Sequence, residues 1–173
     1  MTRGDDLGRV VIPKEIRRTM RIREGDPLEI YTEKDGEVIF KKYSPVGELA
    51  DFALHIVESL NKTTGCCVAV CDRDMVISVS GVPKRELCDK PISMELEKIM
   101  EDRQIYQRGK SDKKIALSEA NEKYACAIAA PIIAEGDVMG CVVFFNDSDH
   151  ILGEVEYKLA QTVSGFLGKQ MES

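Results

Sequence analysis

The first 23 residues carry a dense group of basic side chains. Seven Lys or Arg residues lie there against three acids, a local net charge of +4, whereas the whole chain has a net charge of -6. Four of the basic residues recur at i, i+3, i+4 and i+7, the spacing of one helix face: Lys14, Arg17, Arg18 and Arg21. A solvated helix face gives the same spacing. A basic region on an acidic protein nevertheless favours phosphate binding over general solubility.

The elements that must position these cations are short. Val10–Ile12 is a β-branched run that predicts a strand, and Pro13 suits the first position of a helix. Two strand-like segments follow, at residues 28–33 and 37–42, on either side of Asp35-Gly36. Asp-Gly supplies the positive φ angles of a type I′ turn. The sequence therefore predicts a strand, one or two helical turns and a β-hairpin within residues 1–43.

So small a unit has little apolar surface to bury. It cannot remove enough of that surface from water to offset the conformational entropy lost on folding. We therefore expect it to fold together with a second copy, through intertwined strands.

The residues resemble a known family at this point. The string LGRVVIPKEIRR, from Leu7 to Arg18, is followed by a DPLEI strand, the DG hairpin and Lys41-Lys42-Tyr43. Over about residues 5–43 this closely resembles the AbrB-like, swapped-hairpin DNA-binding domain of bacterial transition-state regulators. In that family two chains interleave their hairpins into one small β-barrel, and arginines contact the DNA.

The resemblance implies DNA contacts at Arg9, Arg17 and Arg18. We add Lys14 and Arg21 from the predicted helix face, and Arg3 as the basic residue of the N-terminal arm. Members of the family usually carry a full β-strand before the acidic pair that matches Asp5-Asp6, and this chain has only residues 1–4 there. Either the missing strand is encoded upstream, which we favour, or the dimer barrel lacks strand pairing at one edge. Inspection of the upstream reading frame would decide between them.

The remainder of the chain predicts a helix and then a mixed domain. Ser44 suits an N-cap and Pro45 the first helical position, and apolar residues recur at helical spacing over residues 45–62. We expect residues 44–63 to be a linker helix that packs on the next domain or pairs in a short coiled coil. Residues 64–173 predict strands at 67–71, 75–79, 115–118, 124–134 and 138–146, helices at 84–88, 93–103 and 153–171, and a loop at 104–114.

This order resembles a GAF domain. Composition and periodicity alone support only an α+β domain with an antiparallel sheet and flanking helices. We call the AbrB-like residues 1–43 the head and the GAF-like residues 64–173 the tail. Together with a closing helix that begins Gly-Glu-Val-Glu, head and tail resemble transcription regulators of sporulation. The resemblance implies a pocket walled by residues 82–118, but no ligand signature is recognisable there. Oligomerisation and the sensing of an unknown small molecule both stay open as roles of the tail.

The cysteines and histidines give little support to enzyme or metal chemistry. None of the six cysteines forms a C-x-x-C pair, and the chain has two histidines. No secretion signal is recognisable, so we expect reduced, structural thiols, no metal and no cofactor. The chain also lacks a P-loop, a dinucleotide fingerprint and a Ser-His-Asp arrangement. A GAF-fold thiol enzyme that reduces free methionine sulfoxide stays open as an alternative to a protein that is not an enzyme.

The sequence therefore predicts a cytoplasmic, nucleoid-associated transcription regulator. Its partners are double-stranded DNA and a second copy of itself, with the choice between dimer and tetramer left open. The apolar runs are too short for a membrane span. An antitoxin-like DNA-binding protein is the main alternative, because swapped-hairpin heads also occur in toxin–antitoxin pairs.

Overall fold

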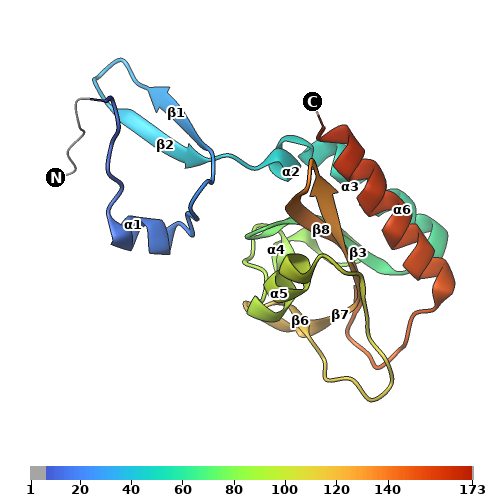
Figure 1. Cartoon of the computed structure of the whole chain (residues 1–173). Coiled ribbons are helices and arrows are strands. Elements are labelled where there is room, and N and C mark those ends of the chain that lie inside the picture. Colours follow the sequence, from blue (N-terminus) through green and yellow to red (C-terminus); the bar gives the residue numbers. More distant parts are fainter. Residues whose placement is uncertain (1–6, 173) are drawn as a thin grey trace. The chain divides into compact units, whose positions relative to one another are not determined.

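The computed structural model describes residues 7–172, which belong to two compact units divided between Tyr43 and Ser44 (Figure 1). The first unit contains a short helix, α1 (Lys14–Thr19), and an antiparallel hairpin of β1 (Leu28–Thr32) and β2 (Val38–Lys42). The predicted helical turns and the hairpin are therefore confirmed.

The hairpin turn differs from the predicted type I′ turn. Gly36 has a φ of 92°, but Asp35 is not in the positive-φ region that a type I′ turn needs at both central residues. The Glu33 N–H donates to the Glu37 carbonyl at 2.9 Å, and the Gly36 N–H donates to the Glu33 carbonyl at 3.1 Å. This pattern is that of a three-residue loop in which the glycine adopts the left-handed conformation.

The strand predicted at Val10–Ile12 does not form within one chain. Val10 makes only an isolated bridge, and Val11 and Ile12 have no assigned structure. A strand needs a neighbour to satisfy its backbone N–H and C=O groups. Pro13 also differs from expectation: with φ -56° and ψ 145° it precedes the helix, which begins at Lys14.

The first unit has no buried residue between positions 7 and 43. Large apolar side chains are exposed instead, Leu7 by 77% and Val11 by 66%. Others of this kind are Val10, Ile16, Ile30, Tyr31, Val38 and Tyr43. A single copy therefore lacks a hydrophobic core in this unit.

The second unit is built on an antiparallel sheet. Its strand order is β4-β3-β8-β7-β5, and β6 also pairs with β7. The strands are β3 (Cys67–Asp72), β4 (Val76–Ser80), β5 (Tyr106–Gln107), β6 (Ala116–Ser118), β7 (Asn121–Ala134) and β8 (Asp137–Asn146). The long central hairpin of β7 and β8 lies where the sequence predicts it. β5, in contrast, lies inside the segment predicted as a loop.

Helices cover both faces of this sheet (Figure 1). They are α2 (Pro45–Glu48), α3 (Ala50–Thr64), α4 (Lys84–Leu87), α5 (Met94–Asp102) and α6 (Glu154–Gln170). The single helix predicted over residues 45–62 is interrupted at Leu49, which caps both α2 and α3. Ser44 is the N-cap as predicted, because its hydroxyl accepts from the Gly47 N–H at 2.9 Å.

Each sheet face has its own core. Side chains alternate along β3, so that Val68 and Val70 pack under α3 and α6, whereas Ala69 and Cys71 pack under α4 and α5. Buried side chains fill the space under α4 and α5: Leu87, Ile92, Leu96, Met100 and Leu117. Among residues 7–172, no helix is both long and apolar enough to cross a bilayer.

Candidate nucleic-acid interface

The short helix α1 presents three of the predicted cations together. Pro13 precedes the helix, and its carbonyl accepts from the Arg17 N–H at 3.0 Å, which closes the first turn. All six residues of α1 are exposed. Lys14, Arg17 and Arg18 therefore lie on one solvent-facing surface, because i, i+3 and i+4 positions are neighbours on a helix.

The predicted helix face is wrong at its fourth cation, Arg21. The helix ends at Thr19, and Arg21 adopts the left-handed conformation with a φ of 55°. The Ile22 N–H donates to the Arg17 carbonyl at 2.7 Å, and the Arg21 N–H donates to the Arg18 carbonyl at 3.2 Å. These two bonds make a Schellman motif, which satisfies the last carbonyls of the helix and turns the chain away from its axis.

The hairpin holds this turn in place. The Lys42 ammonium donates to the Arg21 carbonyl at 2.8 Å. Lys42 thus links the end of β2 to the end of the basic helix. This role was missed from the sequence, because Lys41-Lys42 carries no signal of a contact 21 residues away.

The remaining predicted contact residues are placed as follows. Arg9 is exposed and comes just after Gly8, whose φ is 78°, in the segment that precedes α1. Arg21 is half-buried. Arg3 lies outside the described residues, as does the short arm before Asp5. The structure therefore brings Lys14, Arg17 and Arg18 together on α1, with Arg9 exposed at the approach to it.

Basic residues outnumber acids in the segment that contains this surface. Residues 7–23 contain six basic residues and a single acid, Glu15. Arg23 has a local partner, because its backbone N–H and its guanidinium lie 2.8 and 3.9 Å from Asp26 Oδ2. Exposed guanidinium groups donate in a fixed fork that fits phosphate oxygens and guanine edges. The surface is thus suited to a nucleic acid.

Three of the six cysteines are poorly placed for the alternative thiol chemistry. Hydrogen bonding with Cys141, together with burial, raises the pKa of the Cys71 thiol well above its usual value. Burial likewise raises the pKa of Cys126 and, less strongly, that of Cys67. A thiol with a raised pKa holds little reactive thiolate near neutral pH. Within residues 7–172, no three His, Cys, Asp or Glu side chains are grouped to hold a metal ion.

The fold and this surface define a class of protein: a two-domain chain in which a small basic hairpin domain, suited to a nucleic acid, is followed in sequence by an antiparallel sheet domain. Two family models match the chain. The model described as "Stage V sporulation protein T C-terminal, transcription factor" matches residues 48–172. The model described as "Antidote-toxin recognition MazE, bacterial antitoxin" matches residues 1–48.

Individual proteins agree with these matches. The chain is 49% identical over 170 residues to stage V sporulation protein T of Bacillus subtilis (strain 168), covering 98% of this chain and 95% of that protein. It is 53% identical over 53 residues to the transition state regulatory protein AbrB of the same strain, covering 27% of this chain and 54% of AbrB. The chain belongs to the stage V sporulation protein T family of transcription factors.

A solved structure supports the fold of the second unit. The GAF domain of an Acinetobacter phosphoenolpyruvate-protein phosphotransferase aligns with a TM-score of 0.59 at 14% identity, covering 71% of this chain and 81% of that one. The α+β fold with an AbrB-like head and a GAF-like tail is therefore confirmed, and the protein is a sporulation transcription regulator. The antitoxin match is confined to the head, whereas the transcription-factor model accounts for the rest.

Proposed function

We propose that the protein binds double-stranded DNA as a homodimer, through residues 1–43 of both copies. Arg9, Arg17 and Arg18 are the principal contact residues, and Lys14, Arg21 and Arg3 add to them. The observation that carries this proposal is the solvent-exposed helix α1, with Lys14, Arg17 and Arg18 on its surface. A regulator that acts on DNA in this way works in the cytoplasm, at the nucleoid.

Dimerisation follows from the exposed apolar surface of the head. No side chain of residues 7–43 is fully buried in a single copy, and Leu7, Val11 and Ile30 are all more than 60% exposed. Interleaving two hairpins in a swapped-hairpin barrel would cover these side chains and give Val10–Ile12 a strand to pair with. The same dimer would carry two copies of α1 and so contact two half-sites on a duplex.

The proposed mechanism is electrostatic docking. Arginines from both subunits neutralise phosphates and release condensed counterions, which supplies sequence-independent affinity. Bidentate donation to O6 and N7 of guanine in the major groove would then supply sequence preference. A head with several such arginines can do both.

Salt titration of DNA binding tests this assignment. Replacing Arg17 or Arg18 by Ala in the full chain should lower affinity, and the slope of log K against log salt should fall by about one unit for each phosphate that the variant no longer neutralises. Lys98→Ala is the matched control, because Lys98 is an exposed base of α5 in the second unit. Unchanged affinity and slope in both arginine variants would show that α1 does not bind DNA.

We further propose that the chain is divided into three segments with different roles. Residues 1–43 form the DNA-binding domain, residues 44–63 connect it to the tail, and residues 64–173 form the GAF-like domain. The connecting segment is α2 and α3, and α3 packs on β3 and β4. That packing supports a connector that is built into the tail rather than a free coiled coil.

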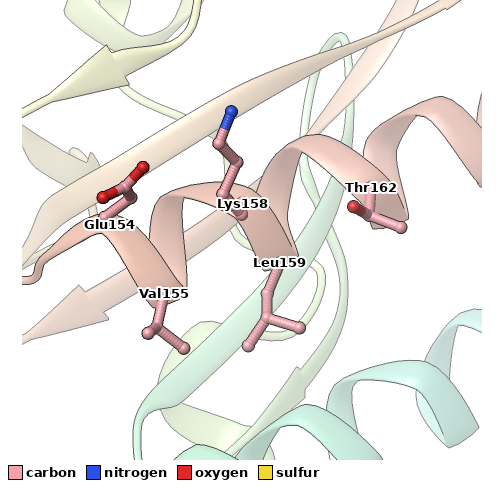
Figure 2. Close-up of a pocket in the computed structure, with 5 residues that line it drawn as sticks. All are labelled: Glu154, Val155, Lys158, Leu159 and Thr162. Atoms are coloured by element: carbon pink, nitrogen blue, oxygen red, sulfur yellow. The ribbon is translucent and has the colours of Figure 1, made fainter.

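The tail offers a surface for assembly of dimers into a tetramer. An open hollow lies along α6, lined by Glu154, Val155, Lys158, Leu159 and Thr162 (Figure 2). Figure 2 shows Val155 and Leu159 on one side of the helix and the Glu154 and Lys158 side chains on another. Val155 is 70% exposed, and Phe166 packs on Phe52 of α3 with ring centroids 5.9 Å apart. We propose that the apolar stripe of α6 formed by Val155, Leu159 and Phe166 pairs with the same stripe of a second copy.

A further inference from the structure

Among residues 7–172, the buried Arg108 has no carboxylate partner. It directly follows β5 and is only 3% exposed. Its Nη2 donates to Asn146 Oδ1 at 3.2 Å, to the Ser148 carbonyl at 3.2 Å and to the His150 carbonyl at 3.0 Å. All three acceptors are uncharged. Its Nη1 is also buried, and within residues 7–172 it has no hydrogen-bond acceptor.

A second buried donor lies two residues earlier in the chain. The Tyr106 hydroxyl has no hydrogen-bond partner among the described residues. Residues two apart on an extended chain point to the same face, so Tyr106 and Arg108 share a side of the sheet. Burial raises the pKa of the Tyr106 phenol, and Cys126 and Asp112 act in the same direction, while Arg108 opposes them. The phenol is therefore protonated at neutral pH and remains a donor.

The carboxylates near this pair already have other partners. Asp149 accepts from the Lys114 ammonium at 2.8 Å and is exposed to solvent. Asp112 accepts from the Gly109 N–H at 2.7 Å. Neither is hydrogen-bonded to Nη1 of Arg108.

Two such donors on the same side of the sheet call for an acceptor. Buried polar groups are nearly always hydrogen-bonded, and a buried charge is nearly always paired. The surrounding charge also favours an anion, because residues 108–114 contain Arg108, Lys110, Lys113 and Lys114 against a single acid, Asp112. A positive segment on an acidic protein raises the local concentration of small anions.

We propose that Tyr106 and Arg108 form a binding site for a small carboxylate. One carboxylate oxygen accepts from Nη1 of Arg108, and the other accepts from the Tyr106 hydroxyl. A carboxylate fits better than a phosphate, because the two Nη1 hydrogens and one hydroxyl hydrogen cannot satisfy the oxygens of a buried phosphate dianion. The site lies in the GAF-like unit and gives a chemical class to the small molecule that this unit would sense. It is independent of the residues proposed to contact DNA.

Calorimetric titration of the full chain tests this site. Sodium acetate and sodium formate are titrated at constant ionic strength, with sodium chloride as the blank and sodium phosphate as the competing anion. We expect saturable binding of a carboxylate with one site per chain, and a melting temperature that rises with its concentration. Absence of saturable binding by both carboxylates up to tens of millimolar would overturn the proposal, and so would phosphate binding as tight as acetate.

Two variants locate the site. Tyr106→Phe removes one hydroxyl and keeps the ring, and it should weaken acetate binding about tenfold. Arg108→Gln should abolish it, but this variant also removes bonds to Asn146, Ser148 and His150, so Tyr106→Phe is the decisive one. Tyr43→Phe, at an exposed tyrosine of the head, is the matched control. Acetate affinity unchanged in Tyr106→Phe would overturn the assignment, and DNA affinity, measured separately, reports on the head alone.

Discussion

Arg21 occupies a position where a helix usually ends with glycine. Its φ of 55° lies in the left-handed region, which costs a residue with a Cβ atom about 1 kcal/mol relative to glycine. Lys42 and the two Schellman hydrogen bonds hold the backbone in this conformation. A strained residue at the end of the proposed DNA-contacting helix makes stability and DNA binding separable by substitution.

Comparing Arg21→Gly with Arg21→Ala measures this strain. Both variants remove the arginine side chain and every contact that it makes, but only glycine is free of the left-handed penalty. The free energy of unfolding of Arg21→Gly should therefore exceed that of Arg21→Ala by about 1 kcal/mol. Denaturant titration of the full chain gives the difference. Equal stabilities would mean that Arg21 leaves the left-handed region in solution.

The same substitutions test the proposed DNA contact. If Arg21 contacts a phosphate, both variants should bind DNA with a salt slope about one unit smaller, whatever their stability. A slope that differs between Arg21→Gly and Arg21→Ala would instead indicate that the helix end, and not the side chain, controls binding.

At the scale of elements, α6 approaches the sheet closely at one point. A Cβ atom on Gly168 would lie 2.2 Å from the Ile133 carbonyl oxygen in β7, whereas one on Gly165, three residues earlier in the same helix, would meet no atom within 4 Å. The difference follows from the helix period, because Gly168 faces the sheet and Gly165 faces solvent. The two glycines thus form a matched pair within one element.

Alanine substitutions at these glycines should have opposite effects. Gly168→Ala should lower the free energy of unfolding by about 1–3 kcal/mol, because the helix must move away from β7. Gly165→Ala should raise it by up to about 1 kcal/mol, because alanine is the better helix former. Chemical denaturation followed by circular dichroism measures both. A stabilised Gly168→Ala variant would contradict the close approach.

The sequence predicted the elements that depend on local patterns. The hairpin of β7 and β8, the helix α6 and the cations of α1 all follow from patterns within short stretches of neighbouring residues. The spacing pattern wrongly placed Arg21 on the helix face, because nothing in an arginine indicates a left-handed conformation. The hairpin turn was misassigned because a shift of one residue in loop length changes the turn type.

Other features depend on distant parts of the chain or on a second chain. The segment Val10–Ile12 has strand-forming residues but forms no strand among residues 7–172 of one copy, where Val10 makes only an isolated bridge. Tyr106 and Arg108 lie in a polar segment that resembles an exposed loop. Their burial comes from contacts with residues about 20 to 40 positions later. The hydrophobic periodicity of a short stretch of sequence cannot indicate contacts between residues so far apart in the chain.

At the scale of the whole molecule, the proposed assembly uses two separate surfaces. The head would dimerise through its exposed apolar residues, and the tail would join dimers through the stripe on α6. Charged substitutions in that stripe, Val155→Asp or Phe166→Asp, should reduce a tetramer to a dimer, because burying an unpaired carboxylate is costly. Light scattering of the full chain gives the mass.

A control separates the stripe from general surface effects. Met94 is exposed by 65% on α5, on the other side of the sheet, and Met94→Asp should leave the mass unchanged. A dimer mass for the unsubstituted chain would exclude assembly through the tail, and the proposal of a tetramer would then fail.

The absence of buried residues between positions 7 and 43 has a consequence for dosage. If the head folds only on association, the amount of DNA-binding protein in dilute solution follows the square of the chain concentration. Doubling expression would then give about four times as many competent heads. Occupancy of the target promoters would then rise more steeply than the amount of protein made. Low basal expression would leave these promoters almost unoccupied.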